Sequence, residues 1–232
     1  MMKRFLFLAL AALSSLLANS SPATAGQISP GTFNALPAPG DVAGTLSTAA
    51  TYGGAVVNDT GLIAYSFGAG NTGTVRELVV ADTSNPYGSG DLSFVFQIHV
   101  TGGDISRVTN SSYPTAILTD VAQGPALAPL DVTGTRAATS ADRPTLSGNV
   151  VGFNFDPPVL VGDPSTTTLA LIIRTNANQY GTGFIGLIDG GAFQASGFAP
   201  TSTSATPEPA SVILLGFGAG GMLAYRWKRR QA

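Results

Sequence analysis

Apolar and polar residues alternate with a period of two through much of the middle of the chain. The clearest stretch is 91–101, where Val95 is the one apolar exception on the more polar face. A period of two places successive side chains on opposite faces of a strand. The apolar residues that we expect to face a core are Leu92, Phe94, Phe96, Ile98 and Val100.

Seven other short segments have strand character, and each is bounded by Gly, Pro, Asn or Asp. No segment between residues 26 and 200 has a convincing helical repeat. The pattern therefore predicts an all-β fold, an antiparallel β-sandwich or jelly roll. The seven predicted strands are 62–67, 74–81, 105–108, 115–121, 150–155, 167–175 and 184–188.

Two flanking segments lack the alternation. Residues 26–40 hold three prolines among small and polar residues, which predicts an irregular N-terminal arm. Residues 198–206 read Phe-Ala-Pro-Thr-Ser-Thr-Ser-Ala-Thr, a composition that predicts a Ser/Thr-rich stalk. The β-sandwich domain itself is then expected to span residues 41–197.

The first 25 residues have the pattern of a signal peptide. Two basic residues precede an apolar stretch, and the segment ends Ala23-Thr24-Ala25. Small residues at Ala23 and Ala25 suit signal peptidase, so we predict cleavage before Gly26. An uncleaved anchor helix is the alternative, and the short apolar stretch with its small-residue end favours cleavage.

Residues 207–232 form a tail of three successive pieces. A Pro-Glu-Pro motif comes first, an apolar run at 210–225 follows, and a basic cluster ends the chain. As a helix the run would rise about 24 Å, somewhat less than the hydrocarbon thickness of about 30 Å, so a buried core helix is the competing interpretation. The tail residues to which we assign roles are Pro207, Glu208 and Pro209 in the motif and Arg226, Trp227, Lys228, Arg229 and Arg230 in the cluster.

Two features of the tail favour a single transmembrane helix at 210–225. The run has no polar face, whereas a helix packed on a globular core has an apolar stripe only. Trp227 suits the membrane interface, and the long cationic side chains can extend to the headgroups. Because basic residues follow the helix, we expect the C-terminus in the cytoplasm and the N-terminus outside.

The order Pro207-Glu208-Pro209, glycine-bearing hydrophobic segment and basic cluster resembles the PEP-CTERM sorting signal of Gram-negative bacteria with exopolysaccharide-rich envelopes. The resemblance implies that exosortase, a membrane enzyme with a catalytic cysteine, cuts near the motif and releases or re-attaches the protein outside the inner membrane. Segments 91–101 and 180–191 are more loosely similar to other PEP-CTERM proteins. This implies a β domain without known activity, at the cell surface or in the extracellular matrix, associated with exopolysaccharide and biofilm.

The composition of residues 26–206 bears on partners. Five arginines and no lysine stand against eleven aspartates and one glutamate, a net charge of about −7. A lysine-free, acidic domain argues against nucleic acid and anionic lipid headgroups as partners. The expected processing partners are signal peptidase and exosortase. Because the chain has no cysteine, its stability must come from burial and backbone pairing.

Catalytic residue types are scarce. His99 is the one histidine, it lies on the more polar face of a predicted strand, and no Gly-x-Ser-x-Gly motif is present. One histidine without cysteine does not make a usual zinc site. Paired carboxylates of a glycoside hydrolase are conceivable, but the aspartates fall at predicted turns. We therefore expect no enzyme and no cofactor, with a secreted hydrolase as the least favoured alternative.

A carbohydrate-binding adhesin, with or without calcium, is the main alternative. Tyrosines at strand edges can stack on sugar rings, although half-buried packing is the more common role: Tyr52, Tyr87, Tyr113 and Tyr180. Oxygen-bearing side chains near strand ends are candidate calcium ligands, without an EF-hand pattern: Asp82, Asn85, Asp91 and Asp104.

Overall fold

The computed structural model describes residues 26–35, 50–68, 70–161 and 166–203. Every regular element in these ranges is a β-strand. Among the same residues there is no helix of the length and apolarity that crossing a membrane requires. The predicted signal peptide (1–25) and the sorting tail (207–232), including the predicted transmembrane helix, lie outside the described residues.

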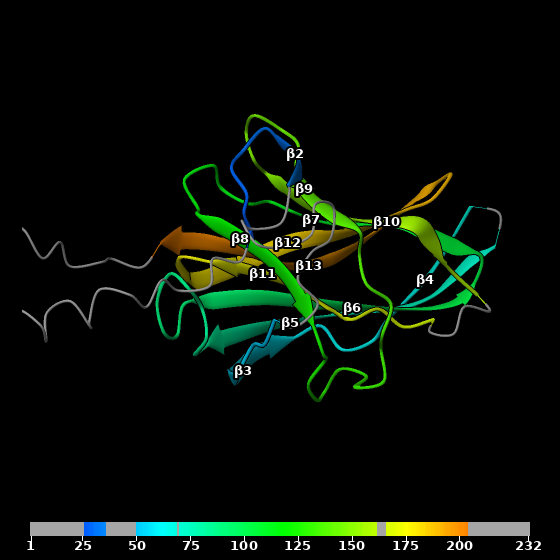
Figure 1. Cartoon of the computed structure of the whole chain (residues 1–232), viewed down its shortest axis with the longest axis horizontal. Helices are drawn as coiled ribbons and strands as arrows, with labels where there is room; N and C mark the ends of the chain where they lie inside the picture. The colour runs from blue at the N-terminus through cyan, green and yellow to red at the C-terminus, as the bar shows by residue number, and fades with distance from the viewer. Residues whose placement is uncertain (1–25, 36–49, 69, 162–165, 204–232) are drawn as a thin grey trace, which may run out of the picture.

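The described strands form two antiparallel sheets that face each other (Figure 1). In the first sheet the strand order is β1–β8–β11–β6–β5–β3, and β4 pairs with β5 beside β3. The strands of this sheet are β1 (Gly26–Gln27), β3 (Gly54–Asp59), β4 (Ile63–Phe67), β5 (Asn71–Asp82), β6 (Leu92–Gly102), β8 (Thr119–Gly124) and β11 (Ala170–Thr175).

The second sheet has the order β13–β12–β7–β10–β9–β2. Its strands are β2 (Thr32–Ala35), β7 (Asp104–Ser111), β9 (Ser140–Arg143), β10 (Val150–Leu160), β12 (Ala177–Ile188) and β13 (Ala192–Thr203). The prediction of an all-β, antiparallel domain is confirmed.

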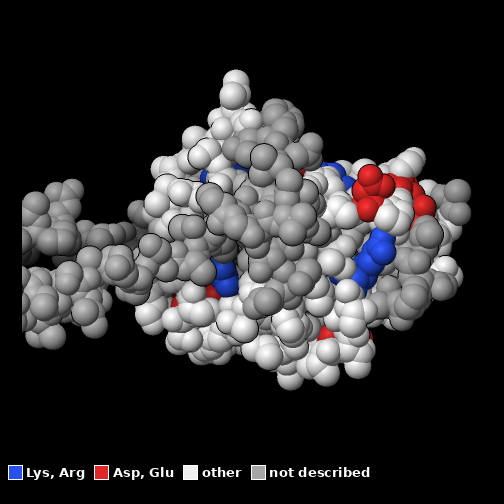
Figure 2. All heavy atoms as spheres, in the orientation of Figure 1, with Lys and Arg blue, Asp and Glu red and all other residues white. Residues whose placement is uncertain are grey.

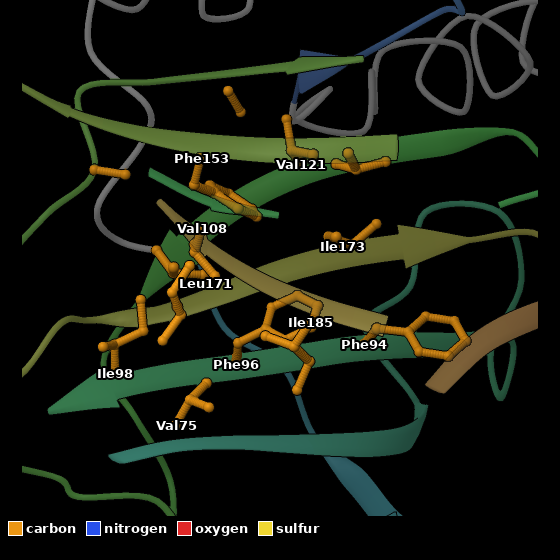
Figure 3. Close-up of a cluster of buried hydrophobic side chains, with 14 of the residues drawn as sticks. Val75, Phe94, Phe96, Ile98, Val108, Val121, Phe153, Leu171, Ile173 and Ile185 are labelled. Atoms are coloured by element: carbon orange, nitrogen blue, oxygen red, sulfur yellow. The ribbon is translucent and has the colours of Figure 1, made fainter. Parts of the chain in front are cut away.

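The main core lies between the two sheets. All five apolar residues that the alternation of 91–101 assigned to a core are buried there. Figure 3 shows Phe94, Phe96 and Ile98 of the first sheet packed with residues of the facing sheet, including Phe153 and Ile185. Because the pleat puts every second side chain inward, one strand supplies five core residues.

A second apolar cluster covers the outer face of the first sheet. Val95 packs there with Leu78 and Ile172, beneath residues of neighbouring loops such as Tyr52 and Leu130. The more polar face of β6 is therefore buried as far as Gln97, and on this face only His99 and Thr101 are exposed. Val95, the exception in the alternation, is apolar because loops cover this face.

The predicted stalk is wrong in its first part. Residues 198–203 are the second half of β13 and pair with β12, with Phe198 opposite Thr182 and Thr203 opposite Ala177. Pro200 lacks a backbone donor, and an edge strand tolerates this because one side of its ladder is free. Residues 204–206 lie outside the described residues.

The predicted N-terminal arm is also partly wrong. Residues 26–27 form β1 at the edge of the first sheet, with Gly26 opposite Val121 of β8. Ile28 follows and is 1% exposed in the main core. Residues 32–35 add β2 to β9 of the second sheet. The start of the segment thus belongs to the fold, because backbone pairing with sheet edges orders even a proline-bearing sequence.

Candidate functional site

A pocket of roughly 210 Å³ opens on the outer face of the first sheet. Strands β5 and β6 form its floor, and the loop between β8 and β9 forms one wall. We call it the outer-face pocket. Its lining residues are Leu62, Thr74, Arg76, Gln97, His99, Pro129, Leu130, Asp131 and Thr167.

The floor follows directly from the strand register. Thr74 lies opposite His99, and Arg76 lies opposite Gln97, on adjacent antiparallel strands. Residues two apart on a strand share a face, so all four side chains point to the same side of the sheet. The sequence predicted His99 on this polar face, and the structure confirms that position.

A short hydrogen-bond chain runs through the pocket. The Nδ1 atom of His99 is 2.8 Å from the hydroxyl of Thr167, and this hydroxyl donates to Asp131 Oδ2 at 3.4 Å. Hydrogen bonds from the Thr133 hydroxyl and backbone lower the pKa of Asp131, with smaller contributions from Thr167 and the charge of His99. The Asp131 carboxylate is thus an anion beside the imidazole at neutral pH.

Arg76 fastens the loop wall to the sheet. Its Nε and Nη2 atoms contact the two oxygens of Asp59 at 2.9 and 2.5 Å, and Nη1 donates to the carbonyl of Pro129 at 2.8 Å. The hydrogen bond from Arg76 lowers the pKa of Asp59, so both groups stay charged and compensate each other. The pocket therefore offers hydrogen-bonding groups without a strong excess of either charge.

The arrangement differs from a Ser-His-Asp triad. In a triad the imidazole lies between the nucleophilic hydroxyl and the carboxylate. Here the hydroxyl of Thr167 lies between His99 and Asp131. Within the described ranges no three His, Cys, Asp or Glu residues come together in a way that would hold a metal ion.

The four candidate calcium ligands do not converge. Asp82 is buried, with its oxygens accepting hydrogen bonds from Gly53, Ser84 and Ser93. Asn85 and Asp91 are near it and also buried. Asp104 lies at the other end of the sheets, where a side-chain hydrogen bond with Asp189 raises its pKa.

None of the four candidate tyrosines presents an open ring for a sugar. Tyr52 and Tyr113 are buried, and the Tyr87 hydroxyl is enclosed although its ring is half-buried. Tyr180 packs edge-on against Phe198, with ring centroids 5.6 Å apart, and its hydroxyl accepts a hydrogen bond from Asn58. Half-buried or buried packing, the more common role, holds for all four.

Glu77 is a buried polar residue that the sequence analysis did not single out. It lies on the inner face of β5, and its two oxygens accept hydrogen bonds from Asn110 of β7 and the backbone of Phe198 in β13. Burial raises its pKa to about 8, against the lowering effect of those two hydrogen bonds. The signal was present in the sequence, since period two places Glu77 between Val75 and Val79.

The fold and the pocket define a class only, an antiparallel two-sheet β domain with a polar pocket on one outer face. The chain carries a more specific feature behind this domain. Residues 205–230 match the family model described as the PEP-CTERM protein-sorting motif. The match confirms the resemblance of the tail and supports a PEP-CTERM protein, exported and sorted by an exosortase to the surface or membrane.

No curated protein and no solved structure matches the chain. The residues with predicted sorting, cleavage and topology roles all lie outside the described residues, except Gly26 at the start of β1.

Proposed function

We propose that the protein is a non-enzymatic component of the cell surface or extracellular matrix, associated with exopolysaccharide and sorted through Pro207-Glu208-Pro209. The observation that carries the proposal is the sorting-motif match at 205–230, directly behind a β domain whose last strand ends at Thr203. Signal peptidase removes residues 1–25. The helix at 210–225 then holds a single-pass intermediate, with its basic end in the cytoplasm, until exosortase cuts.

The chemistry of the described domain supports a non-enzymatic role. His99 is hydrogen-bonded to the Thr167 hydroxyl, and Asp82, one of the candidate calcium ligands, accepts hydrogen bonds from Ser84 and Ser93. A general acid or base has to reach a substrate proton directly or through one water. Buried groups such as Asp82 and Glu77 do not have that access.

The mass of the C-terminal peptide of protein recovered from cells tests the sorting step. The wild-type protein should end near Pro207, and a variant with Pro207→Ala and Pro209→Ala should keep its tail to Ala232. A matched control carries Pro86→Ala and Pro125→Ala, two exposed prolines of the β domain, and should be cut like wild type.

An intact Ala232 terminus in the membrane fraction of both the wild type and the motif variant would contradict exosortase processing. The protein would then be a plain single-pass anchored protein. Equal loss of the tail in both would show that the prolines are not what the processing enzyme reads.

A second candidate function is binding of a carbohydrate chain in the outer-face pocket. The pocket combines planar polar groups of Arg76, His99 and Asp131 with the exposed apolar side chain of Leu62, a combination that suits a polyhydroxylated ring. Retention of the mature protein on immobilised exopolysaccharide, with and without calcium, tests it. His99→Ala and Asp131→Ala should lose retention together, whereas Leu146→Ala outside the pocket should not.

A further inference from the structure

Three loops lie at the end of the domain from which the C-terminal tail leaves. β13 ends at Thr203, and the match to the sorting-motif family begins at residue 205. Loops 83–90 and 112–118 lie near this point, and loop 144–149 packs against the second of them. We call these three loops the tail-side end.

Hydrogen bonds join these loops to the point where β13 ends. Thr203 pairs with Ala177, and the side chain of the preceding Asn176 accepts a hydrogen bond from Leu118 at 2.9 Å. Asn85 donates to the carbonyl of Thr175, also at the β11–β12 connection, at 3.0 Å. The third loop is joined by the Thr115 hydroxyl, which donates to the Ser147 carbonyl. The tail thus leaves beside loops 83–90 and 112–118, and loop 144–149 is connected to this point through loop 112–118.

The tail-side end carries no charge. None of the residues in these three loops, all within the described part of the chain, is Asp, Glu, Lys or Arg. The charged residues at their bases point inward: Asp82, Asp91 and Arg143 are all buried. The domain has a net charge of about −7, so its exposed charged side chains are distributed unevenly and lie away from this end.

The opposite end of the sheets differs in this respect. Asp104 begins β7 and Asp189 follows β12, so both lie at the strand ends remote from the tail. In Figure 2 the largest red and blue areas lie in the right half of the view, and a smaller area of blue and red lies left of centre.

Exposed apolar side chains accompany the missing charge. Leu118 is 45% exposed beside the end of β13, and Leu146 on the adjoining loop is 88% exposed. Pro86 and Pro114 are exposed on the other two loops. Single exposed leucines are ordinary on a protein surface, but these two coincide with a charge-free end and with the exit of a membrane-directed tail.

We infer that the tail-side end rests on the uncharged or zwitterionic lipid surface of the membrane that holds the tail, with Leu118 at the contact and Leu146 beside it. This inference rests on the proposed insertion of residues 210–225. Six residues lie between Thr203 and Ala210, and a fully extended chain covers about 24 Å over the seven steps from one to the other. Every anchored molecule is therefore held with this end close to the bilayer.

A lipid surface fits better than the other occupants of such an end. Anionic headgroups would call for exposed lysine or arginine, which the three loops lack. A second copy of the chain fits less well, because the tail holds this end close to the membrane and leaves little room for another domain there. An interface without cations instead predicts contact that is insensitive to salt and to anionic lipid.

The test uses residues 26–232, the chain that remains after removal of residues 1–25, reconstituted in phosphatidylcholine vesicles. Since the chain has no cysteine, single variants Leu118→Cys and Leu146→Cys can carry an environment-sensitive fluorophore. Val161→Cys is the matched control, because Val161 is 49% exposed and lies beside Gly103 at the opposite end. Lipids with a nitroxide headgroup should quench the label at 118, and to a smaller degree at 146, at least twofold more than the label at 161.

Flotation of the vesicles separates this inference from the proposed function. If the chain floats but the labels at 118 and 161 are quenched equally, the proposed lipid contact of the tail-side end is wrong, whereas the membrane insertion of the tail is still supported. If the chain does not float, the inserted tail fails and the docking fails with it. If the fluorescence of the label at 118 changes with the number of protein molecules per vesicle, this end contacts a second copy of the chain and the lipid contact is wrong. Stronger quenching in vesicles with phosphatidylglycerol, or at low salt, would contradict an uncharged contact.

Discussion

The side-chain amide of Asn110 donates a hydrogen bond to Glu77 Oε1 across the interior of the domain, at 2.8 Å. The same amide donates to the carbonyl of Phe198, whose own N–H donates to Glu77 Oε2 at 2.9 Å. Three strands from two sheets are therefore joined by a single carboxyl group. This group is the domain's one glutamate, and it has no cationic partner within ion-pair distance among the described residues.

Glu77 should make the domain less stable as pH rises toward 8. Its pKa is about 8 in the folded protein against an ordinary value of 4.5, so the folded state binds more protons between these values. Its stabilising contribution is complete below about pH 4.5 and is lost as pH rises through 8. At pH values well between 4.5 and 8, where Glu77 is protonated in the folded state and ionised in the unfolded state, the free energy of unfolding should fall by about 1.4 kcal/mol per pH unit.

Urea unfolding between pH 6.5 and 8 measures this slope. Asp120, whose pKa burial raises to about 6, contributes mainly below that window. Glu77→Gln keeps the shape of the side chain without the charge and should flatten the curve, whereas Asp120→Asn should leave its slope nearly unchanged. An equal slope in wild type and Glu77→Gln would show that another group titrates.

Gly197→Ala should destabilise the domain. A Cβ atom at this position would be 2.3 Å from Glu77 Oε2 and 2.8 Å from the Ile185 side chain. Relief of such overlap in a packed interior costs about 1–3 kcal/mol. Gly191→Ala is the control, because its Cβ would lie in ordinary contact, 3.5 Å from Phe67. Chemical denaturation measures the stability of both variants. Equal stability of Gly197→Ala and Gly191→Ala would refute the steric argument.

Arg143→Lys should cost about 3 kcal/mol. The buried guanidinium donates four hydrogen bonds, to the carbonyls of Gly148, Ile117 and Pro114 and to the Thr119 hydroxyl. An ammonium on a flexible stem has three donors at one point and cannot satisfy four separated acceptors. Thermal and urea unfolding should show a large loss for this variant.

Arg136→Lys provides the comparison for Arg143. Its contacts to the carbonyls of Pro157 and Pro158 lie on a more exposed surface, so the change should stay within about 0.5 kcal/mol. If both lysine variants lost the same stability, the fourfold bonding of Arg143 would not be the reason.

Chain ends placed on either side of residues 198–203 test the extent of β13. A protein starting at Gly26 and ending at Thr203 should keep its cooperative unfolding transition. One ending at Gly197 loses the ring of Phe198 against Tyr180 and the donor to Glu77, which should cost about 3 kcal/mol or more. Equal melting temperatures for the two would restore the stalk interpretation.

Strand β6 was predictable because its alternation is nearly strict and its buried set follows from the pleat alone. β13 was not, because its Ser, Thr, Ala and Pro content is that of a linker, and only its position at a sheet edge makes the composition tolerable. The start of the N-terminal arm was missed for a related reason. Its order comes from pairing with β8 and β9, which are distant in sequence.

The candidate site was predictable only in part. The sequence placed His99 on the polar face of its strand, but its neighbours Asp131 and Thr167 come from segments more than thirty residues away. No local pattern indicates such proximity. The sorting tail is the opposite case, since its three pieces are contiguous and can be read without any fold.

The position of β13 at the sheet edge has a mechanical consequence for a domain held by its tail. A pull on residue 203 along the strand axis loads the β12–β13 ladder in shear, so many of its backbone hydrogen bonds resist together. A pull across the strands would instead open them one at a time, starting at Ala177. The fold should thus bear tension from flow best when the domain trails in line with its tether.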